Sequence, residues 1–117
     1  MMDDDRVWEF EEGLWTGTAE HYQGLIDENC LIVLPIPSLV FSGEQAITAV
    51  ASTPRWTKVV LTGQRTARPD EGLIVVAYHI AASRDDERYV ARRTSTYRRR
   101  AHDDWQGVQH QQTPLAA

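Results

Sequence analysis

Apolar residues at spacings of three and four mark the first part of the chain as helical. The stripe consists of Val7, Phe10, Leu14, Trp15, Ala19, Tyr22 and Ile26. Asp3 to Asp5 precede it, where the positive end of a helix dipole favours acidic side chains. The pattern therefore predicts an amphipathic helix that packs one face against a core.

Gly17 and Thr18 interrupt this stripe without changing its phase. We expect a break there, with Thr18 capping a second, shorter helix whose first turn carries Glu20. Asn29 is the expected end of that helix.

A short buried strand, Leu31 to Leu34, is expected next, because Pro35 and Pro37 remove the donors that would continue its ladder. Ser42 with Gln45 then fits a capping box. We expect a third helix over Gly43 to Ala51.

The remainder of the chain favours strands. We expect them over Trp56 to Thr66, Leu73 to Ser83, Tyr89 to Arg99 and Trp105 to Thr113. Gly63 is a candidate bulge, and Arg84 to Glu87 form a charged turn. Because no helix separates these strands, they should pair antiparallel. Long strands of this kind curl, so the expected fold is α+β, with three helices on one face of a curved sheet.

A turn centred between Asp85 and Asp86 assigns the two faces of that sheet. The face expected to lie under the helices carries Ile74, Val76, Tyr78, Ile80, Ala91, Arg93, Ser95, Tyr97, Val108, His110 and Gln112. The outer face carries Leu73, Val75, Ala77, His79, Arg92, Thr94, Thr96, Gln109, Gln111 and Thr113, and in this register also Trp105. Its mixed polarity suits a homodimer interface.

Composition narrows the function classes. The chain has 117 residues, which fits a single domain over 1–117. Its net charge of −5 argues against general binding to nucleic acid or anionic membranes. The apolar run Cys30 to Ile36 is too short to span a bilayer. The acidic start is unlike a signal peptide, so we expect a cytoplasmic protein.

The order of elements resembles the nuclear transport factor 2-like superfamily, which includes ketosteroid isomerases and SnoaL-type cyclases, and most of all its domain of unknown function 4440 branch. The resemblance rests on Glu11-Glu12-Gly13-Leu14-Trp15, Phe41-Ser42-Gly43, Arg93 through Arg99, and Trp105 through Pro114. It implies a cone-shaped, cystatin-like roll with an antiparallel or mixed sheet, a pocket between sheet and helices, and frequent dimers. It does not imply one function.

The resemblance also offers a test for isomerase chemistry. In ketosteroid isomerases a carboxylate base precedes a proline that corresponds here to Pro35, so the base position is Leu34. A leucine cannot abstract a proton, and the expected inner face of the sheet carries no acid. No catalytic residue is therefore assigned.

Two inner-face residues carry candidate chemistry. His110 titrates near neutrality and lies beside Ser95, where it either serves as an acid/base or is a hydrogen-bonded structural histidine. A buried Arg93 must find a partner. It leans out to solvent, pairs with Glu20 or another helix acid, or awaits an anionic ligand. No metal-ligand spacing and no cofactor motif is present.

The sequence thus predicts a dimeric pocket protein that binds a small, partly apolar, anionic ligand. The expected ligand-binding residues are Trp15, Tyr22, Tyr78, Arg93, Ser95, Tyr97, His110 and Gln112. The four aromatic members either wall a pocket or are ordinary core. The alternatives are an isomerase, cyclase or dehydratase that uses His110, and a purely structural dimerisation module.

Overall fold

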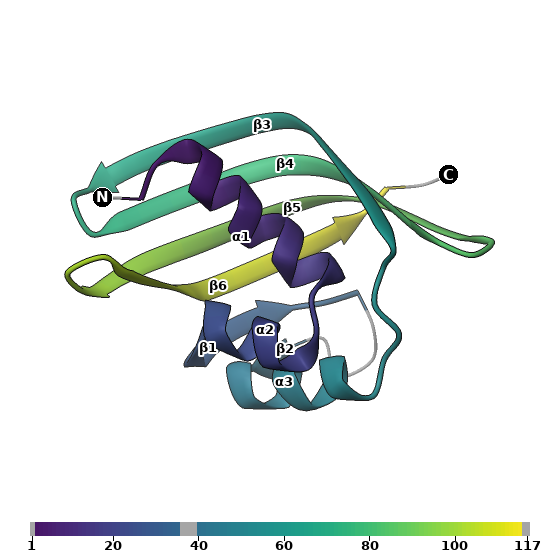
Figure 1. Ribbon diagram of the computed structural model, residues 1–117. Helices are drawn as coiled ribbons and strands as arrows, with labels where there is room; N and C mark the ends of the chain where they lie inside the picture. Colours follow the sequence, from purple (N-terminus) through teal and green to yellow (C-terminus); the bar gives the residue numbers. More distant parts are fainter. Residues whose placement is uncertain (1, 36–39, 116–117) are drawn as a thin grey trace.

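The computed structural model describes residues 2–35 and 40–115 as three helices over a six-stranded sheet (Figure 1). The helices are α1 (Asp4–Thr16), α2 (Ala19–Leu25) and α3 (Gly43–Ala51). The strands are β1 (Ile26–Val33), β2 (Val40–Ser42), β3 (Lys58–Asp70), β4 (Leu73–Arg84), β5 (Glu87–Ala101) and β6 (Asp104–Pro114). The predicted α+β class and helix order are confirmed.

Each helix begins at a side-chain cap. The Asp3 side chain accepts a hydrogen bond from the Arg6 backbone N–H of α1 at 2.9 Å. The Thr18 side chain accepts one from the His21 backbone N–H of α2 at 3.2 Å. Ser42 and Gln45 form the predicted capping box of α3. The predicted break at Gly17 and Thr18 is therefore confirmed.

The expected end of the second helix at Asn29 is wrong. Helix α2 ends at Leu25, and β1 begins at once with Ile26, which pairs with Gly107 of β6. Ile26 continues the helical spacing of apolar residues in the sequence. Its pairing with β6 nevertheless places it in the sheet. The strand reaches Val33 and Pro35 follows it, whereas Pro37 lies outside the described residues.

The sheet is mixed and open, with strand order β2-β1-β6-β5-β4-β3. Among the described strands, only the β1–β6 pair is parallel. The short β2 was not predicted. The third strand begins at Lys58 rather than Trp56 and continues past Thr66, because its pairing with β4 extends to Asp70. Gly63 has a φ of 61° at a register shift, which confirms the predicted bulge.

The β4–β5 register matches the prediction, with Tyr78 opposite Arg93. The β5–β6 pair matches at Ser95 and His110 but then shifts, so that Gly107 rather than Val108 opposes Tyr97. This irregularity returns Trp105 to the helix-covered face, where it is 2% exposed. Its predicted position on the outer face is wrong, because a bulge reverses the alternation of side chains.

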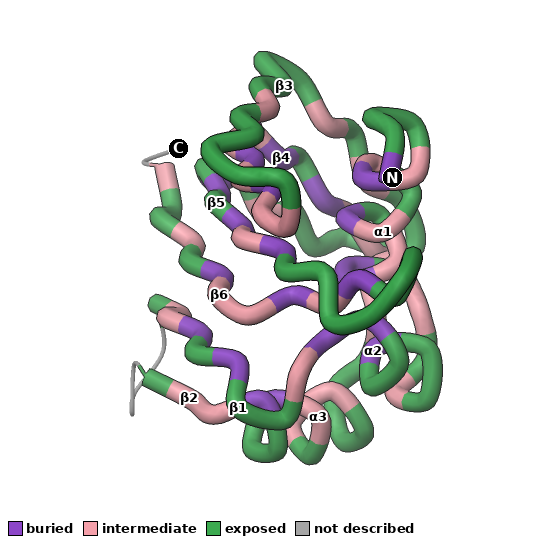
Figure 2. The backbone as a smooth tube through the Cα atoms, turned by 90° about the vertical axis from the view of Figure 1, so that its left-hand side faces the viewer, coloured by how far each residue is buried: buried purple, intermediate pink, exposed green. Residues whose placement is uncertain are grey.

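Helix α1 crosses β4 and β5, while α2 and α3 lie at the β1–β2 end of the sheet (Figure 1). Buried and less buried residues alternate along β4 and β5 (Figure 2). The residues buried under α1 include Ile74, Val76, Ile80 and Tyr97. No described helix has the length and apolar content needed to cross a bilayer.

No described segment covers the opposite face of the sheet (Figure 1). Leu31, Val40, Val60 and Val90 are the exposed large hydrophobic residues among those described, at 38% to 58% exposure. The strand registers place all four on this uncovered face, because each lies in a cross-strand row with outward-facing residues of the neighbouring strands.

Candidate ligand-binding site

A buried carboxylate, Glu11, organises the centre of the molecule. It lies one turn before Trp15 on the sheet-facing side of α1 and is 0% exposed. Its Oε1 accepts hydrogen bonds from the Tyr78 hydroxyl at 2.6 Å and from Ser95 Oγ at 2.9 Å, and its Oε2 accepts one from the Tyr97 hydroxyl. Three hydroxyl donors therefore offset the cost of burying this acid.

The two tyrosines act as donors because their phenols stay protonated. Burial raises the pKa of Tyr78 and of Tyr97 above the ordinary value of 10.0. Trp15 supports the arrangement by donating its indole N–H to the Tyr78 oxygen at 2.9 Å. The hydrogen-bond chain thus runs from Trp15 through Tyr78 to Glu11.

Arg93 supplies the charge that balances Glu11. Its Nε lies 3.5 Å from Glu11 Oε1 and donates to Ser95 Oγ at 3.3 Å. The guanidinium carbon lies 5.0 Å from the centre of the Trp15 ring, a cation–π distance. Of the three partners that the sequence left open for this arginine, a helix acid is present, and it is Glu11 rather than Glu20.

His110 is a neutral, fully buried member of the same network. Its Nδ1 lies 2.7 Å from Ser95 Oγ. Since that hydroxyl donates its own hydrogen bond to Glu11, Nδ1 is the donor to Ser95 and Nε2 carries the lone pair. Burial, and secondarily the charge of Arg93, lowers the pKa of His110 well below 6.5. The ring is therefore neutral at pH 7.

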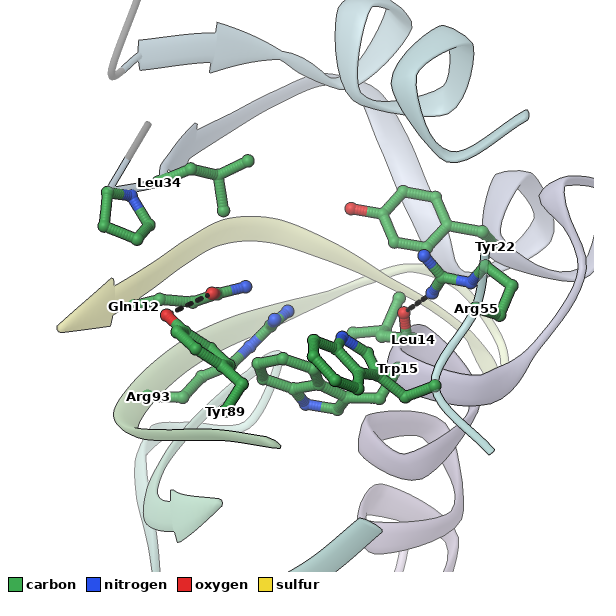
Figure 3. Close-up of a pocket in the computed structure, with 10 residues that line it drawn as sticks. Leu14, Trp15, Tyr22, Leu34, Arg55, Tyr89, Arg93 and Gln112 are labelled. Atoms are coloured by element: carbon green, nitrogen blue, oxygen red, sulfur yellow. Dashed lines mark hydrogen bonds between the residues drawn. The ribbon is translucent and has the colours of Figure 1, made fainter. Parts of the chain in front are cut away.

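A cavity of about 240 Å³ opens beside this network, between the sheet and the first two helices (Figure 3). It is lined by Leu14, Trp15, Tyr22, Leu34, Pro35, Arg55, Trp56, Tyr89, Arg93 and Gln112. Most of the described wall is apolar or aromatic, and among its described side chains only Arg55 and Arg93 carry charge. Such a composition is typical of small-molecule sites.

The two arginines of the cavity differ in how their donors are used. Arg55 donates from Nε to the Gly17 carbonyl at 2.8 Å and from Nη2 to the Leu14 carbonyl, so it caps the end of α1. Arg93 is 5% exposed, and its Nη2 has no hydrogen-bond partner among the described residues. A buried donor without a partner is costly, so Arg93 is the polar group of this cavity that most needs one.

The predicted ligand-binding residues divide into two groups. Trp15, Tyr22, Arg93 and Gln112 line the cavity. Tyr78, Ser95, Tyr97 and His110 are not among its lining residues and are joined through Glu11 and Ser95 instead. Tyr78 and Tyr97 pack in the hydrophobic core, which was the alternative to their lining a pocket.

Sequence reasoning missed Glu11, Arg55, Trp56 and Tyr89. Glu11 had a detectable signal, because it lies four residues after Val7 and three before Leu14, within the apolar stripe of α1. An acid at such a position must find buried partners. Arg55 and Trp56 belong to the segment between α3 and β3, for which the hydrophobic pattern specifies no orientation.

Leu34 lies on the cavity wall, at the position where the resemblance places a general base. The described lining residues include no aspartate, glutamate or histidine. Across the described residues, no group of three or more His, Cys, Asp or Glu side chains is arranged to hold a metal ion. The chemistry of this wall is therefore hydrogen-bond donation and apolar contact.

Solved structures with similar folds are numerous. A proposed ketosteroid isomerase from Parabacteroides distasonis has a TM-score of 0.82 at 16% identity, covering 95% of this chain and 86% of that one. A nuclear transport factor 2-like protein of unknown function in nutrient uptake from Rhodospirillum rubrum has a TM-score of 0.79 at 17% identity, covering 97% and 100%. The association domain of C. elegans CaMKII has a TM-score of 0.75 at 12% identity, covering 92% and 88%.

No protein-family model matches the chain, and no curated protein matches it. At these identities the likeness establishes the fold, which is nuclear transport factor 2-like, and leaves function open. The resemblance to the superfamily is confirmed at the level of fold, while the assignment to the domain of unknown function 4440 branch stays a prediction.

Proposed function

We propose that this protein binds a small, partly apolar anion in the cavity beside Arg93. The observation that carries the proposal is Arg93, which lines the cavity and whose buried Nη2 has no hydrogen-bond partner among the described residues. An anionic oxygen placed there would satisfy it with a charge-assisted hydrogen bond.

Size and wall composition limit the ligand. The cavity volume of about 240 Å³ is below the roughly 300–1,000 Å³ of pockets for drug-sized molecules. The aromatic part of the cavity wall consists of Trp15, Tyr22, Trp56 and Tyr89. These features favour a compact molecule with an apolar body and one charged end.

The arrangement favours binding over the alternative of an isomerase, cyclase or dehydratase. Such an enzyme needs an acid/base within reach of its substrate. Leu34 occupies the position of the family's base, and the His110 ring is not part of the described cavity wall. No described residue of the wall supplies the missing carboxylate.

We further propose that two copies associate through the uncovered sheet face. Exposed Leu31 and Val60 lie near opposite edges of that face, and Thr94 and Thr96 lie between them on β5. Apolar and short polar residues together are typical of homodimer interfaces. The presence of an association domain among proteins with similar folds supports the same proposal.

A thermal-shift experiment tests the anion site with benzoate and its uncharged isostere benzamide. We expect benzoate to raise the melting temperature and benzamide to leave it nearly unchanged. Arg93→Lys, which keeps a cation but removes the forked donors, should lose most of the benzoate shift. Arg99→Lys, the same change at an exposed position of β5, is the matched control and should keep it.

Two results would oppose the proposal. One is an equal shift with benzamide, and the other is an undiminished benzoate shift in a folded Arg93→Lys variant. Circular dichroism establishes that the variant is folded, and Arg93→Gln gives a second test if the lysine variant is not.

A further inference from the structure

We infer that the ligand is a cyclic or aromatic monocarboxylate, and that Gln112 is the second residue that holds its carboxylate. This inference rests on the proposed function and specifies the chemical class that the cavity accepts. It follows from the donors, the charge and the ring stacking at the cavity.

Gln112 is positioned beside Arg93 by the sheet. The two residues are cross-strand partners on β6 and β5, and both side chains lie along the cavity wall (Figure 3). The Tyr89 hydroxyl donates to Gln112 Oε1 at 3.0 Å. With Oε1 turned to Tyr89, the amide nitrogen and its N–H donors lie on the other side of the group (Figure 3).

Two donor side chains, Arg93 and Gln112, therefore lie side by side at the polar end of the cavity. A group that accepts at two coplanar oxygens matches such a pair, and a carboxylate is the simplest group of this kind. An alcohol or amine would bring a donor of its own. A ligand whose polar end is a hydrogen-bond donor therefore fits this end of the cavity poorly.

Charge balance selects a monoanion. Arg55 and Arg93 contribute two positive charges at the cavity, and the buried Glu11 contributes one negative charge 3.5 Å from Arg93 Nε. The sum is one net positive charge. A carboxylate carries one negative charge, whereas a phosphate monoester carries about −1.5 to −2 near neutral pH. A phosphate would leave excess negative charge near buried Glu11.

The ring systems favour a flat ligand body. Trp56 and Tyr89 stack with ring centres 6.0 Å apart and planes 16° apart, and Trp15 lies 6.1 Å from Tyr89. Leu34 and Pro35 add apolar surface from the end of β1. A planar ring makes more contact with such walls than a branched chain of the same volume.

Isothermal titration calorimetry with benzoate, phenyl phosphate and benzamide tests this assignment. We expect benzoate to bind at millimolar concentration or tighter, and phenyl phosphate to bind at least about tenfold more weakly. Gln112→Leu should weaken benzoate binding by about tenfold or more, because it removes one hydrogen bond to a charged group. Gln64→Leu, the same change at an exposed position of β3, should leave benzoate binding unchanged.

The outcomes separate the two claims. Phenyl phosphate binding as tightly as benzoate, or Gln112→Leu binding benzoate as the wild type does, would overturn the monocarboxylate assignment and leave the anion site standing. Failure of all three compounds to bind, or benzamide binding as well as benzoate, would overturn the anion site itself. A Gln112→Glu variant gives a further check, because its added negative charge should abolish benzoate binding while leaving the fold intact.

Discussion

At the scale of single residues, the buried Glu11 carboxylate organises the interior through its contacts. Ionised groups are almost never fully buried unless they are paired and hydrogen-bonded. Here three hydroxyls and the Arg93 guanidinium surround one carboxylate. The pairing holds the Nε side of Arg93 toward Glu11, while Nη2 has no partner among the described residues, so the buried acid orients the proposed ligand contact.

The first prediction concerns that pairing. Glu11→Gln keeps the shape of the side chain but leaves Arg93 charged and unpaired, and it should lower the free energy of unfolding by about 3–5 kcal/mol. Urea denaturation measures the difference. Glu12→Gln, the adjacent and exposed residue of α1, should change stability by less than about 0.5 kcal/mol. Equal effects of the two substitutions would mean that Glu11 is not the organising partner.

The second prediction concerns His110 and pH. Its pKa is lowered in the folded protein, so between that value and 6.5 the unfolded chain binds a proton that the folded protein does not. Stability should therefore fall as the pH drops below 6.5, because the unfolded chain then gains a proton that the folded protein does not. His110→Asn retains an N–H donor for Ser95 and should flatten the slope measured by urea denaturation. An unchanged slope in that variant would assign the effect to other groups.

The third prediction concerns Cys30, which is fully buried on β1. Burial raises the pKa of its thiol to about 12, so almost no thiolate exists at pH 8. A thiol reagent such as Ellman's reagent should react with the unfolded chain and leave the native protein almost unmodified. Rapid stoichiometric reaction under native conditions would contradict the burial of this strand.

At the scale of elements, local chemistry was predictable and pairing irregularities were not. The Thr18 cap, the Ser42–Gln45 capping box and the turn between β4 and β5 depend on neighbours in sequence, and all were predicted. The position of Trp105 depends on irregularities in the β5–β6 pair that no local signal marked. Where strands bulge, the period of two no longer assigns faces.

The candidate site was predictable only in part for the same reason. Trp15 and Arg93 were identified because they lie on regular elements with a clear periodicity. The remaining arginine of the wall, Arg55, lies between α3 and β3 and is positioned by carbonyls at the end of α1. Contacts of this kind depend on tertiary structure rather than on pattern.

The fourth prediction belongs to the packing of α3 against β1. A Cβ added at Gly43 would collide with the backbone carbonyl of Asp27, whereas one added at Gly24 would meet no atom within 4 Å. Gly43→Ala should therefore destabilise the protein by more than about 1 kcal/mol. Gly24→Ala should be neutral or stabilise it by up to about 1 kcal/mol, because alanine favours helix. Thermal unfolding of the two variants compares them directly, and a stable Gly43→Ala variant would contradict this close approach.

At the scale of the whole molecule, the sheet separates two roles. Its covered face carries the buried network and the cavity, while its outer face carries exposed apolar residues in cross-strand rows. The proposed ligand site and the proposed dimer surface therefore use opposite faces of the same strands. Changes on one face should leave the other intact.

The fifth prediction tests that separation. Wild-type protein should have twice the mass of one chain in light scattering at micromolar concentration. Val75→Lys, on the outer face of β4, should give a monomer because it places a charge within the interface. Val75→Thr, which is similar in size and uncharged, should remain a dimer. A monomeric wild type would count against the dimer without affecting the cavity.

Arg93 and its neighbour Gln112 are proposed to donate together to an anionic ligand. Side-chain nitrogen-15 NMR of the Arg93 guanidinium and the Gln112 amide during a benzoate titration tests this proposal most directly. Saturable shifts of both signals with benzoate, and none with benzamide, are the predicted result. Signals that stay unchanged while benzoate reaches saturating binding by calorimetry would place the ligand away from Arg93 and Gln112.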